Sequence, residues 1–495
     1  MVGHLVAEGS VYAFLAEHRR RLFPDEMFTD LFPTRRGRPS VAADVVATVM
    51  LLQSLEGLSD RDAIVSLRTD LRWKVAAGLA LGDEGFHPTV LTLWRNKLRD
   101  SDRPQRIFDA VRQVVAETGV LKGKTRRALD STLLDDAVAT QDTVTQLVSM
   151  IRRVRAAVPE AGEVDVVAHD YTAGGKPSCA WDDPAARDEL VTALVTDALA
   201  ILERVDGVVL AEDQAQLVAL LALVAGQDVE PDPDRGDGAW RIARAVAKDR
   251  VISTVDPETR HMHKSRSNYR DGYKAHVAVE PDTGIITGCD LTPANSGDGA
   301  AGVALLAGEE PGLEVLADSA YGSGPVRHDL NAANHTAVIK PWPLARNPKL
   351  GADQFHRDDF TVDHQNRTVT CPEGRTVHIS PSGAAIFGTR CSGCPARSRC
   401  TSAVDGKTFK VTEHDHLLAA ARADWTTGIG VDDYRQHRPM VERSIAWLVA
   451  NNNRRVRYRG VERNRIGLST RVAAINLRRL LNLGLHHSPN GWAIT

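Results

Sequence analysis

Apolar residues recur at helical spacing through most of residues 1–120. The stretch SVAADVVATVMLLQSLEGLSDRDAIVSLRTDLRWKVAAGL predicts helices on either side of a turn at GLSDRDAI, where Ser59 has the character of an N-cap. The following FHPTVLTLWRNKLRD predicts a loop and then an amphipathic helix that carries Trp94 and three basic residues. Several short helices that end in a basic one indicate a helix-turn-helix-like DNA-binding unit.

Shorter apolar runs further along the chain have the length of strands. TRRALDST predicts a strand that ends in Asp130, and YKAHVAVEPDTGIITGCDLT (273–292) predicts two strands joined by a hairpin turn at PDTG. GAAGVALLAGEE predicts a helix, EVLADSAYGS a strand that ends in Asp318, and HTAVIK (335–340) a further strand. This order predicts a mixed α/β fold whose first half is dominated by strands.

Residues 141–248 have a different pattern. QDTVTQLVSMIRRVRAAV, RDELVTALVTDALAILERV and AQLVALLALVAG predict long helices, and the acidic loop DVEPDPDRGDG follows them. We interpret this stretch as a helical insertion between the first strand and the hairpin. Its excess of acids indicates that it stays away from a phosphate backbone or contacts a protein partner.

The composition is that of a soluble globular protein. The chain has 495 residues, 43% of them hydrophobic and 25% charged, which indicates about three domains. No stretch approaches the ~20 apolar residues of a membrane span, and the first residues lack the regions of a signal peptide. We therefore expect a cytoplasmic protein without a membrane partner.

The net charge of −3 argues against nucleic-acid binding, but the positive charge is concentrated near the C-terminus. Beyond Tyr434 only Glu442 and Glu462 oppose a long series of arginines. The arginines are Arg435, Arg438, Arg443, Arg454, Arg455, Arg457, Arg459, Arg463, Arg465, Arg471, Arg478 and Arg479. Their density in NNNRRVRYRGVERNR favours a surface for a phosphate backbone over a solvated helix face.

Two aspartates occupy similar places in the pattern. Asp130 and Asp318 each end a short apolar run and each precede small or hydroxyl residues, in DST and DSA. A single Asp at a strand end is usually a turn former or a helix cap. Two of them on neighbouring strands would bind a divalent metal, because ligands gather at the carboxyl ends of strands.

A third carboxylate lies on a predicted helix, DDYRQHRPMVERSIAWLVANN (432–452). Tyr434, Arg438 and Glu442 follow one another at four-residue steps and share a helix face. A Glu beside an Arg is most often a surface ion pair of small energy. Together with two strand-end aspartates it would complete an oxygen site for Mg²⁺, and paired Mg²⁺ ions catalyse phosphodiester chemistry.

The motif series DST…ADSAYGS…YRQHRPMVERSIAWL resembles the DDE-type transposases of bacterial insertion sequences. DPETRHMHKSRSNYRDGYKAHVAVE (256–280) is similar to their lead into the second strand, and RGRPSVAADVVATVMLLQSLEGLSDRDAI to their N-terminal domain. The resemblance implies a ribonuclease H-like mixed sheet with flanking helices. It also implies that Asp130, Asp318 and Glu442 hold Mg²⁺ or Mn²⁺ and catalyse DNA cleavage and strand transfer.

The chain departs from the family pattern on the last catalytic helix. Tyr434 lies one residue further from Arg438 than the pattern prescribes, and Val449 stands where the family has a lysine. Arg454 or Arg455 is the candidate to replace that lysine. The residues that we expect to bind DNA are Tyr434, Arg438, Arg454, Arg455, Arg457 and Arg459.

The cysteines divide into two groups. Cys179 and Cys289 are isolated, whereas four others occur in TCPEGR and RCSGCPARSRCT, with one C-x2-C pair. The four are Cys371, Cys391, Cys394 and Cys400. Buried thiols are the simpler interpretation, but the loop-rich surroundings favour a small zinc-ribbon-like module with a structural Zn²⁺. The resembling transposases often carry a cysteine-bearing insertion at this place.

These patterns predict a division into five parts. The parts are an N-terminal helical DNA-binding or dimerisation domain (1–120), a ribonuclease H-like core (121–140 and 249–345), the acidic helical insertion (141–248), the cysteine-bearing insertion (346–430), and the Glu helix with the basic C-terminus (431–495). We expect DNA as the partner, both the terminal inverted repeats and the target, and a homodimer, since transposition holds two ends together.

Alternatives remain open at this point. A metal-dependent nuclease of the same fold would cut without joining strands, and a transposase derivative could bind DNA without catalysis. A zinc-containing transcription regulator would use the cysteines but would leave the three acidic residues unexplained. Among the carboxylates, Asp135, Asp136, Asp290 and Asp298 are the other candidates, and Asp298 reads as the N-terminal residue of a helix.

Overall fold

The computed structural model describes residues 3–33, 41–265 and 268–495. The N-terminal helices are α1 (Val11–Leu22), α2 (Ala43–Glu56), α3 (Asp60–Thr69), α4 (Leu71–Ala77), α5 (Thr89–Arg99) and α6 (Arg106–Thr118), with 3-10 turns at Gly3–Leu5 and Asp25–Leu31. The predicted helical N-terminus is confirmed, and so is the N-cap, because the Ser59 side chain accepts from the Asp62 amide. The RGRPS stretch at 36–40 and residues 266–267 lie outside the described residues.

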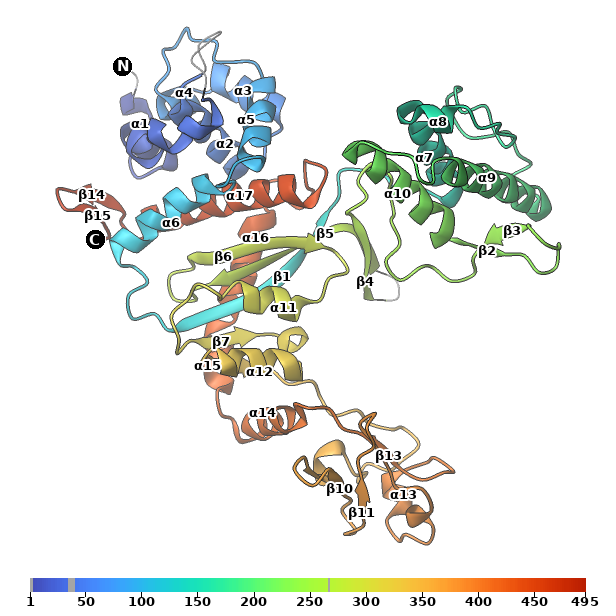
Figure 1. Cartoon of the computed structure of the whole chain (residues 1–495). Coiled ribbons are helices and arrows are strands. Elements are labelled where there is room, and N and C mark those ends of the chain that lie inside the picture. The colour runs from blue at the N-terminus through green and yellow to red at the C-terminus, as the bar shows by residue number, and fades with distance from the viewer. Residues whose placement is uncertain (1–2, 34–40, 266–267) are drawn as a thin grey trace.

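A six-stranded mixed sheet forms the centre of the molecule, in the order β4-β5-β1-β7-β8 with β6 paired to β5 (Figure 1). Its strands are β1 (Arg126–Asp135), β4 (Arg260–Ser265), β5 (Asn268–Val279), β6 (Ile286–Pro293), β7 (Glu314–Ala317) and β8 (Thr336–Ile339). The β1, β4 and β6 pairings with β5 are antiparallel, whereas β1–β7 and β7–β8 are parallel. The predicted mixed α/β fold is confirmed.

The prediction that the first strand ends in Asp130 is wrong. β1 continues to Asp135, because its antiparallel ladder with β5 extends from the pair Ala128–Val279 to the pair Asp135–Gly272. The parallel partner β7 is much shorter and pairs with β1 only up to Ala128. At Asp130, therefore, the pairing of β1 with β7 has ended, whereas its pairing with β5 continues.

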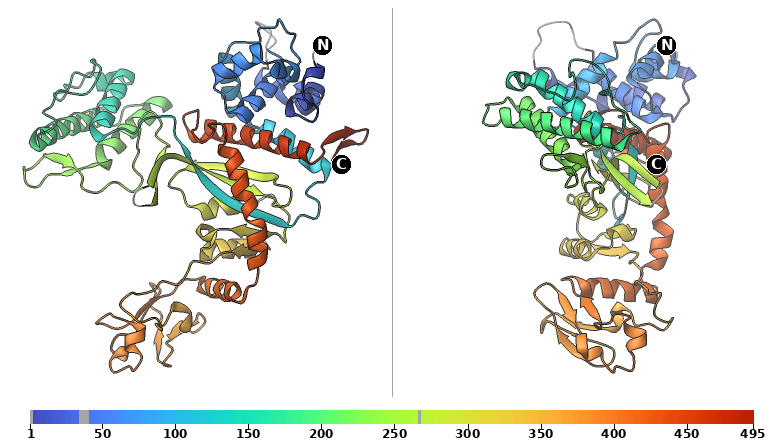
Figure 2. Two further views of the ribbon diagram at one scale, coloured as in Figure 1. Left: turned by 180° about the vertical axis from the view of Figure 1, so that it is seen from behind. Right: turned by 90° about the vertical axis from the view of Figure 1, so that its right-hand side faces the viewer.

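Helices cover both faces of the sheet. They are α11 (Asp298–Ala304), α12 (Gly324–Ala332), α15 (Val431–His437), α16 (Pro439–Val449) and α17 (Val461–Asn482). α16 packs on β1 and β5, and α17 packs on β6, whereas α11 packs on β5 and β1, and α12 packs on β8. Figure 2 shows α17 between the N-terminal helices and the sheet, so one long helix connects the two layers.

The predicted helix over 432–452 is wrong in two respects. It is divided into α15 and α16 at Arg438, and it ends at Val449. The division comes from Pro439, which has no amide hydrogen to donate and occupies the first position of α16. Arg438 itself keeps helical torsion angles, so the change of direction is small.

The insertion is built as its own unit around a separate apolar core. It comprises α7 (Thr143–Ala157), α8 (Pro159–Gly162), α9 (Pro184–Arg204), α10 (Glu212–Gln227) and a hairpin of β2 (Val229–Pro231) and β3 (Trp240–Ile242). The long helices were predicted and the hairpin was not. The two ends of the insertion meet, because the Gln141 amide donates to the Ile252 carbonyl at 2.8 Å and the Thr254 amide donates to Gln141 Oε1 at 2.7 Å.

The cysteine-bearing segment also has its own small core, which includes Phe360, Phe387 and Phe409. Its elements are β9 (Thr361–Asp363), β10 (Thr368–Thr370), β11 (Thr376–His378), β12 (Ala384–Ile386), β13 (Thr408–Lys410), α13 (Arg397–Cys400), α14 (Asp415–Thr427) and 3-10 turns at Arg357–Asp359 and Gly388–Cys391. In Figure 1 the insertion and this segment extend from different sides of the sheet.

The chain ends in a short hairpin of β14 (His486–Ser488) and β15 (Gly491–Ala493) after α17. Near the middle of α17, Arg471 is 4% exposed and donates to the carbonyls of Ser54 and Leu55 at 2.6 Å each. It therefore joins the C-terminal end of α2 to the helix that crosses the sheet. None of the helices in the described residues is both long and apolar enough to cross a bilayer.

Candidate functional site: a carboxylate centre and an arginine cleft

Asp130 and Asp318 lie level with each other on neighbouring strands. In the parallel ladder Ala128 is opposite Leu316, and each aspartate follows two residues later on its own chain segment. The two are near enough that the charge of Asp318 raises the pKa of Asp130. Asp318 also caps the 3-10 turn Ser319–Tyr321, since its Oδ1 accepts from the Ala320 amide at 2.9 Å.

Asp130 is a largely buried carboxylate with two partners. Its Oδ1 accepts from the Ser131 amide at 2.7 Å, and its Oδ2 lies 2.8 Å from Arg438 Nη2. Burial raises the pKa of Asp130, the Arg438 guanidinium opposes that effect, and the neighbouring Asp318 adds to it. A cation bound here would favour the ionised form.

Glu442 faces the same point from α16. Its Oε1 lies 3.7 Å from Arg438 Nη1, and its side chain is 69% exposed. Burial raises the pKa of Tyr434, Arg438 opposes this, and the charges of Asp318, Glu442 and Asp130 then raise it further. Tyr434 is thus within electrostatic reach of all three carboxylates, and the arrangement brings together the residues that the sequence predicted from three distant segments.

The place of Arg438 in the arginine series predicted that it belongs to a solvent-facing basic surface. The structure shows instead that it is buried. The residue is 5% exposed, and its guanidinium lies between Asp130 and Glu442. Its Nε and Nη1 atoms are buried without a hydrogen-bond partner in the described part of the chain. Arg471 is the second buried member of that series.

The donor set fits a hard divalent cation in its chemistry, since all three candidate ligands offer carboxylate oxygens. Within the described residues, however, no three side chains of His, Cys, Asp or Glu are already arranged as a metal-binding group. Arg438 accounts for this at the carboxylates, because its guanidinium is the cation that Asp130 and Glu442 share here. A metal would have to compete with it for the same oxygens.

A polar network that was not predicted from the sequence supports β1 directly beside Asp130. Ser131 Oγ donates to Asp298 Oδ1 at 2.7 Å, and Lys274 Nζ lies 3.1 Å from the same oxygen. His276 is fully buried nearby, and burial lowers its pKa to about 4, so its ring is neutral at pH 7. Asp298 is the first residue of α11, as expected, but it also ties that helix to the strand.

The other candidate carboxylates have different surroundings. Asp290 pairs with Arg465 at 2.7 Å, and Asp135 pairs with Arg270 at 2.7 Å. Burial raises the pKa of Asp136 to about 6, with further contributions from neighbouring carboxylates. Asp135 is the last residue of β1, five residues beyond Asp130, and it borders a second feature.

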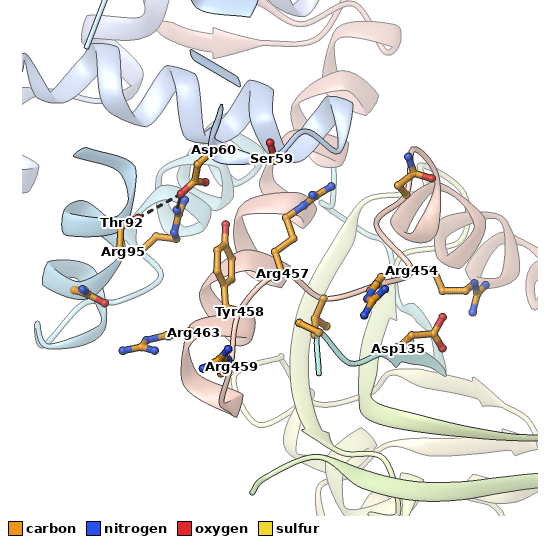
Figure 3. Close-up of a pocket in the computed structure, with 15 residues that line it drawn as sticks. Ser59, Asp60, Thr92, Arg95, Asp135, Arg454, Arg457, Tyr458, Arg459 and Arg463 are labelled. Atoms are coloured by element: carbon orange, nitrogen blue, oxygen red, sulfur yellow. Dashed lines mark hydrogen bonds and ion pairs between the residues drawn. The ribbon is translucent and has the colours of Figure 1, made fainter. Parts of the chain in front are cut away.

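That feature is a cavity of about 800 Å³ between the N-terminal helices and the end of β1, which we call the arginine cleft (Figure 3). Its lining residues are Ser59, Asp60, Thr92, Arg95, Asn96, Asp135, Ala137, Asn452, Arg454, Arg455, Val456, Arg457, Tyr458, Arg459 and Arg463. Six arginines face only two carboxylates there. Four of the six belong to the residues that the sequence predicted to bind DNA.

The arginines of the cleft are held in place largely by backbone carbonyls. Arg454 Nη1 donates to the Leu133 carbonyl at 3.2 Å, Arg455 Nε to the Asp136 carbonyl at 2.9 Å, and Arg457 to the Gly57 carbonyl. Carbonyl contacts orient a guanidinium without neutralising it. In the described residues, ion pairs with carboxylates involve none of the cleft arginines from 454 onward, so their charge remains available to an anion.

The wall from the N-terminal helices fits closely against this segment. Arg95 pairs with Asp60 and lies over the Tyr458 ring at 4.6 Å from its centroid. Gly57 has a left-handed φ of 68°, and a Cβ there would lie 1.7 Å from the Asn451 carbonyl oxygen. The glycine is required both for the end of α2 and for this close approach.

The four clustered cysteines border one small cavity of about 20 Å³ in the cysteine-bearing segment. Burial raises the pKa of the Cys400 thiol, Lys407 opposes this, and the charges of Cys391, Cys371 and Cys394 then raise it. The Lys407 amide donates to Cys391 Sγ at 3.4 Å. The four thiols therefore converge, although less tightly than ligands around a bound ion.

Two stretches of the chain are similar to known protein families. Residues 244–477 match the family described as Transposase DDE domain, and residues 6–97 match the one described as Transposase domain (DUF772). Asp318 and Glu442 lie inside the first range, and Asp130 lies outside both. The comparisons with curated proteins and with solved structures give no match.

Proposed function

Because the chain belongs to the DDE transposases of insertion sequences, we propose that it cuts DNA at the ends of such an element and joins the freed ends to target DNA. The observation that carries the proposal is the level placement of Asp130 and Asp318 with Glu442 across Arg438. Asp130 and Glu442 flank one buried guanidinium, and Asp318 lies level with Asp130 on the neighbouring strand. The mixed order of antiparallel and parallel strands supports a ribonuclease H-like sheet.

Mg²⁺ or Mn²⁺ would supply the Lewis acid that activates the attacking oxygen and stabilises the leaving oxygen of a phosphodiester. Asp130, Asp318 and Glu442 would hold it. The first step is hydrolysis: a water oxygen bonds to phosphorus, the bond from phosphorus to the 3′ oxygen breaks, and the proton that the water loses is balanced by the one that the 3′ oxygen takes up to become a hydroxyl. In the second step the 3′-hydroxyl attacks a target phosphodiester, so one P–O bond replaces another.

The chain's own cations would position the phosphates. Arg438 lies at the carboxylates with Tyr434 beside it, and its positive charge would attract a phosphate there. Arg454, Arg455, Arg457 and Arg459 would hold the backbone in the arginine cleft. Arg454 and Arg455 stay the candidates for the family lysine, because Val449 packs against the main apolar core.

The same proposal extends to the parts of the chain. The N-terminal helices would bind the element's ends, the sheet with α16 would carry the chemistry, and a homodimer would hold two ends. The separate cores of the insertion and of the cysteine-bearing segment support the division at about 141–248 and 346–430.

The test is an assay on a DNA fragment that carries the element's own ends. With Mg²⁺ or Mn²⁺ we expect cleavage at the ends and products joined to a target plasmid, and with EDTA neither. Cleavage without joined products would indicate a nuclease of the same fold. Binding without any cleavage in either metal would indicate an inactive DNA-binding derivative and would contradict the proposal.

We also propose that Cys371, Cys391, Cys394 and Cys400 bind a structural Zn²⁺ in a zinc-ribbon-like module. Their convergence on one small cavity supports this, as does the small size of the core around them, which includes only short strands. A small module of this kind gains much of its folding free energy from a metal.

Replacing Cys394 with Ser is expected to remove the metal from the purified protein, because three thiolates bind Zn²⁺ far more weakly than four. Metal analysis should find about one zinc per wild-type chain and much less in the variant. Limited proteolysis should then cut within 346–430. Cys179→Ser, in the insertion, is the matched control and should keep the zinc. If the wild-type protein, purified under reducing conditions, contained no zinc, the proposal would be contradicted.

A further inference from the structure

We propose that α11 sets the separation of Asp130 and Asp318, and that it does so through Asp298 and Gly302. The proposal deepens the proposed function and rests on it, since it assigns these two residues a positioning role at the same carboxylate centre. Both lie on one face of α11, four residues apart. Neither would touch the metal or the DNA, so both would act through the neighbours of the two aspartates.

The strand pairing alone does not set this separation. The parallel ladder between β1 and β7 ends at the pair of Ala128 and Leu316, two residues before each aspartate. β7 itself ends at Ala317, and Asp318 already caps the turn that follows. Beyond Ala128, β1 keeps its ladder to β5 on one edge only. Contacts other than backbone pairing therefore have to hold this part of β1 relative to Asp318.

Asp298 holds the segment beside Asp130. Asp130 points to the face of β1 that α16 covers, where it pairs with Arg438, and Ser131 points to the opposite face, where α11 packs. Ser131 Oγ donates to Asp298 Oδ1 at 2.7 Å, and the Ser131 amide donates to Asp130 Oδ1 at 2.7 Å. Lys274 Nζ, on a side chain that is almost fully buried, lies 3.1 Å from Asp298 Oδ1 and holds that oxygen in place. Ser131 thus connects α11 to the carboxylate of Asp130.

Gly302 lies against the segment beside Asp318. The Tyr321 amide donates to the Asp318 carbonyl at 3.1 Å, and the Tyr321 ring is buried against α11. A Cβ on Gly302 would lie 2.6 Å from Tyr321 Cε1 and 3.2 Å from Leu129 Cδ1. Leu129 directly precedes Asp130, so this glycine lies against neighbours of both aspartates. The helix approaches them this closely because the glycine has no side chain.

The Tyr321 hydroxyl extends toward the network around Asp298. It is buried without a hydrogen-bond partner in the described part of the chain. Burial raises the pKa of Tyr321, and the charges of Asp298 and Asp130 raise it further. α11 thus contacts both β1 and the turn Ser319–Tyr321 (Figure 1). Because one helix contacts both segments, a shift of either segment against it changes the separation of the two aspartates.

The first test uses Gly302→Ala in the full-length protein. Alanine ordinarily stabilises a helix relative to glycine, but here its Cβ has to displace the Tyr321 ring and, with it, the turn and Asp318. We expect Mn²⁺ binding, measured without DNA from the electron paramagnetic resonance of the free ion, to weaken about tenfold or more. Only the Mn²⁺ that Asp318→Asn no longer binds is counted. Gly308→Ala, with nothing within 4 Å of the added Cβ, is the matched control and should bind as the wild type.

Ser131→Ala tests the other contact. It removes the hydroxyl that donates to Asp298 and keeps the amide that donates to Asp130, whereas a change of Asp298 would also leave Lys274 without its carboxylate. We expect a similar loss of Mn²⁺ affinity, and Ser131→Thr, which keeps a hydroxyl, should restore it. A merely structural role would lower the unfolding temperature and leave the affinity unchanged. Wild-type affinity in Ser131→Ala would overturn the role of Asp298, and the same result in Gly302→Ala would overturn that of Gly302.

Hydrogen exchange without metal separates failure of the proposed function from failure of this proposal. If the wild type binds no Mn²⁺ that depends on Asp318, the carboxylate centre does not hold the metal and the proposed function is contradicted. The position of the turn is then followed by exchange of the amides of residues 319–322. They should exchange faster in Gly302→Ala than in the wild type and in Gly308→Ala. Unchanged exchange there would overturn the proposal.

Discussion

Asp130→Asn and Asp318→Asn should each lose cleavage and strand transfer by at least about a thousandfold, which corresponds to about 4 kcal/mol of transition-state stabilisation. Asparagine keeps the shape of the side chain and an oxygen that can accept from the Ser131 amide or cap the turn after β7. It removes the negative charge that would bind the cation. Activity is measured on the element's ends as a rate of cleavage and as the yield of joined product.

The two variants differ in a useful way. Asp130→Asn leaves the buried Arg438 with only the more distant, exposed Glu442 as a charged partner, whereas Asp318→Asn does not disturb the pair of Arg438 and Asp130. Binding to end DNA in EDTA and thermal unfolding should show that both proteins are folded. Asp329→Asn, an exposed carboxylate on α12, is the matched control and should remain active. Full activity in either site variant would show that its carboxylate is misassigned.

Arg471→Ala should lower the free energy of unfolding by about 3 kcal/mol or more, because it leaves several buried carbonyl groups without a donor. Besides the two carbonyls of α2, the guanidinium donates to those of Trp447, Leu448 and Ala450 at the end of α16. Burial lowers its pKa to about 10, so it remains charged at pH 7. Urea titration followed by circular dichroism measures the loss.

Arg478→Ala is the control for this prediction. Arg478 lies on the same helix, is only half-buried, and should change stability by about 0.5 kcal/mol or less. Hydrogen exchange should show the loss of protection in Arg471→Ala at the ends of α2 and α16. An unchanged unfolding midpoint would show that water can replace the guanidinium at these carbonyls.

The extent to which the sequence predicted the fold depended on how local each signal was. The helices of the N-terminus, the hairpin at PDTG and the insertion helices follow from periodicity and turn residues over a few positions. The end of β1 did not, because Asp130 breaks the apolar run while the ladder to β5 continues for five more residues. A partner strand far away in the sequence decided that boundary.

The number of charges along the chain also could not predict which arginines are buried. Arg438 and Arg471 belong to the same basic series as Arg455 and Arg457, yet the first two are buried and the last two are exposed. Their partners come from distant segments, such as Asp130 for Arg438. The carboxylates were easier to predict, since each follows a short apolar run or shares a helix face with Tyr434.

The closed base of the insertion has a consequence for how the chain folds. Pairing of Asp135 with Gly272 has to close a long loop, and non-local pairings of this kind slow folding. Since Gln141 meets Ile252 and Thr254, an insertion that folds first on its own core shortens the effective loop to a few tens of residues. Loop-closure entropy would then fall by about 1–2 kcal/mol. The segment that interrupts the sheet in sequence thereby promotes the nucleation of the sheet.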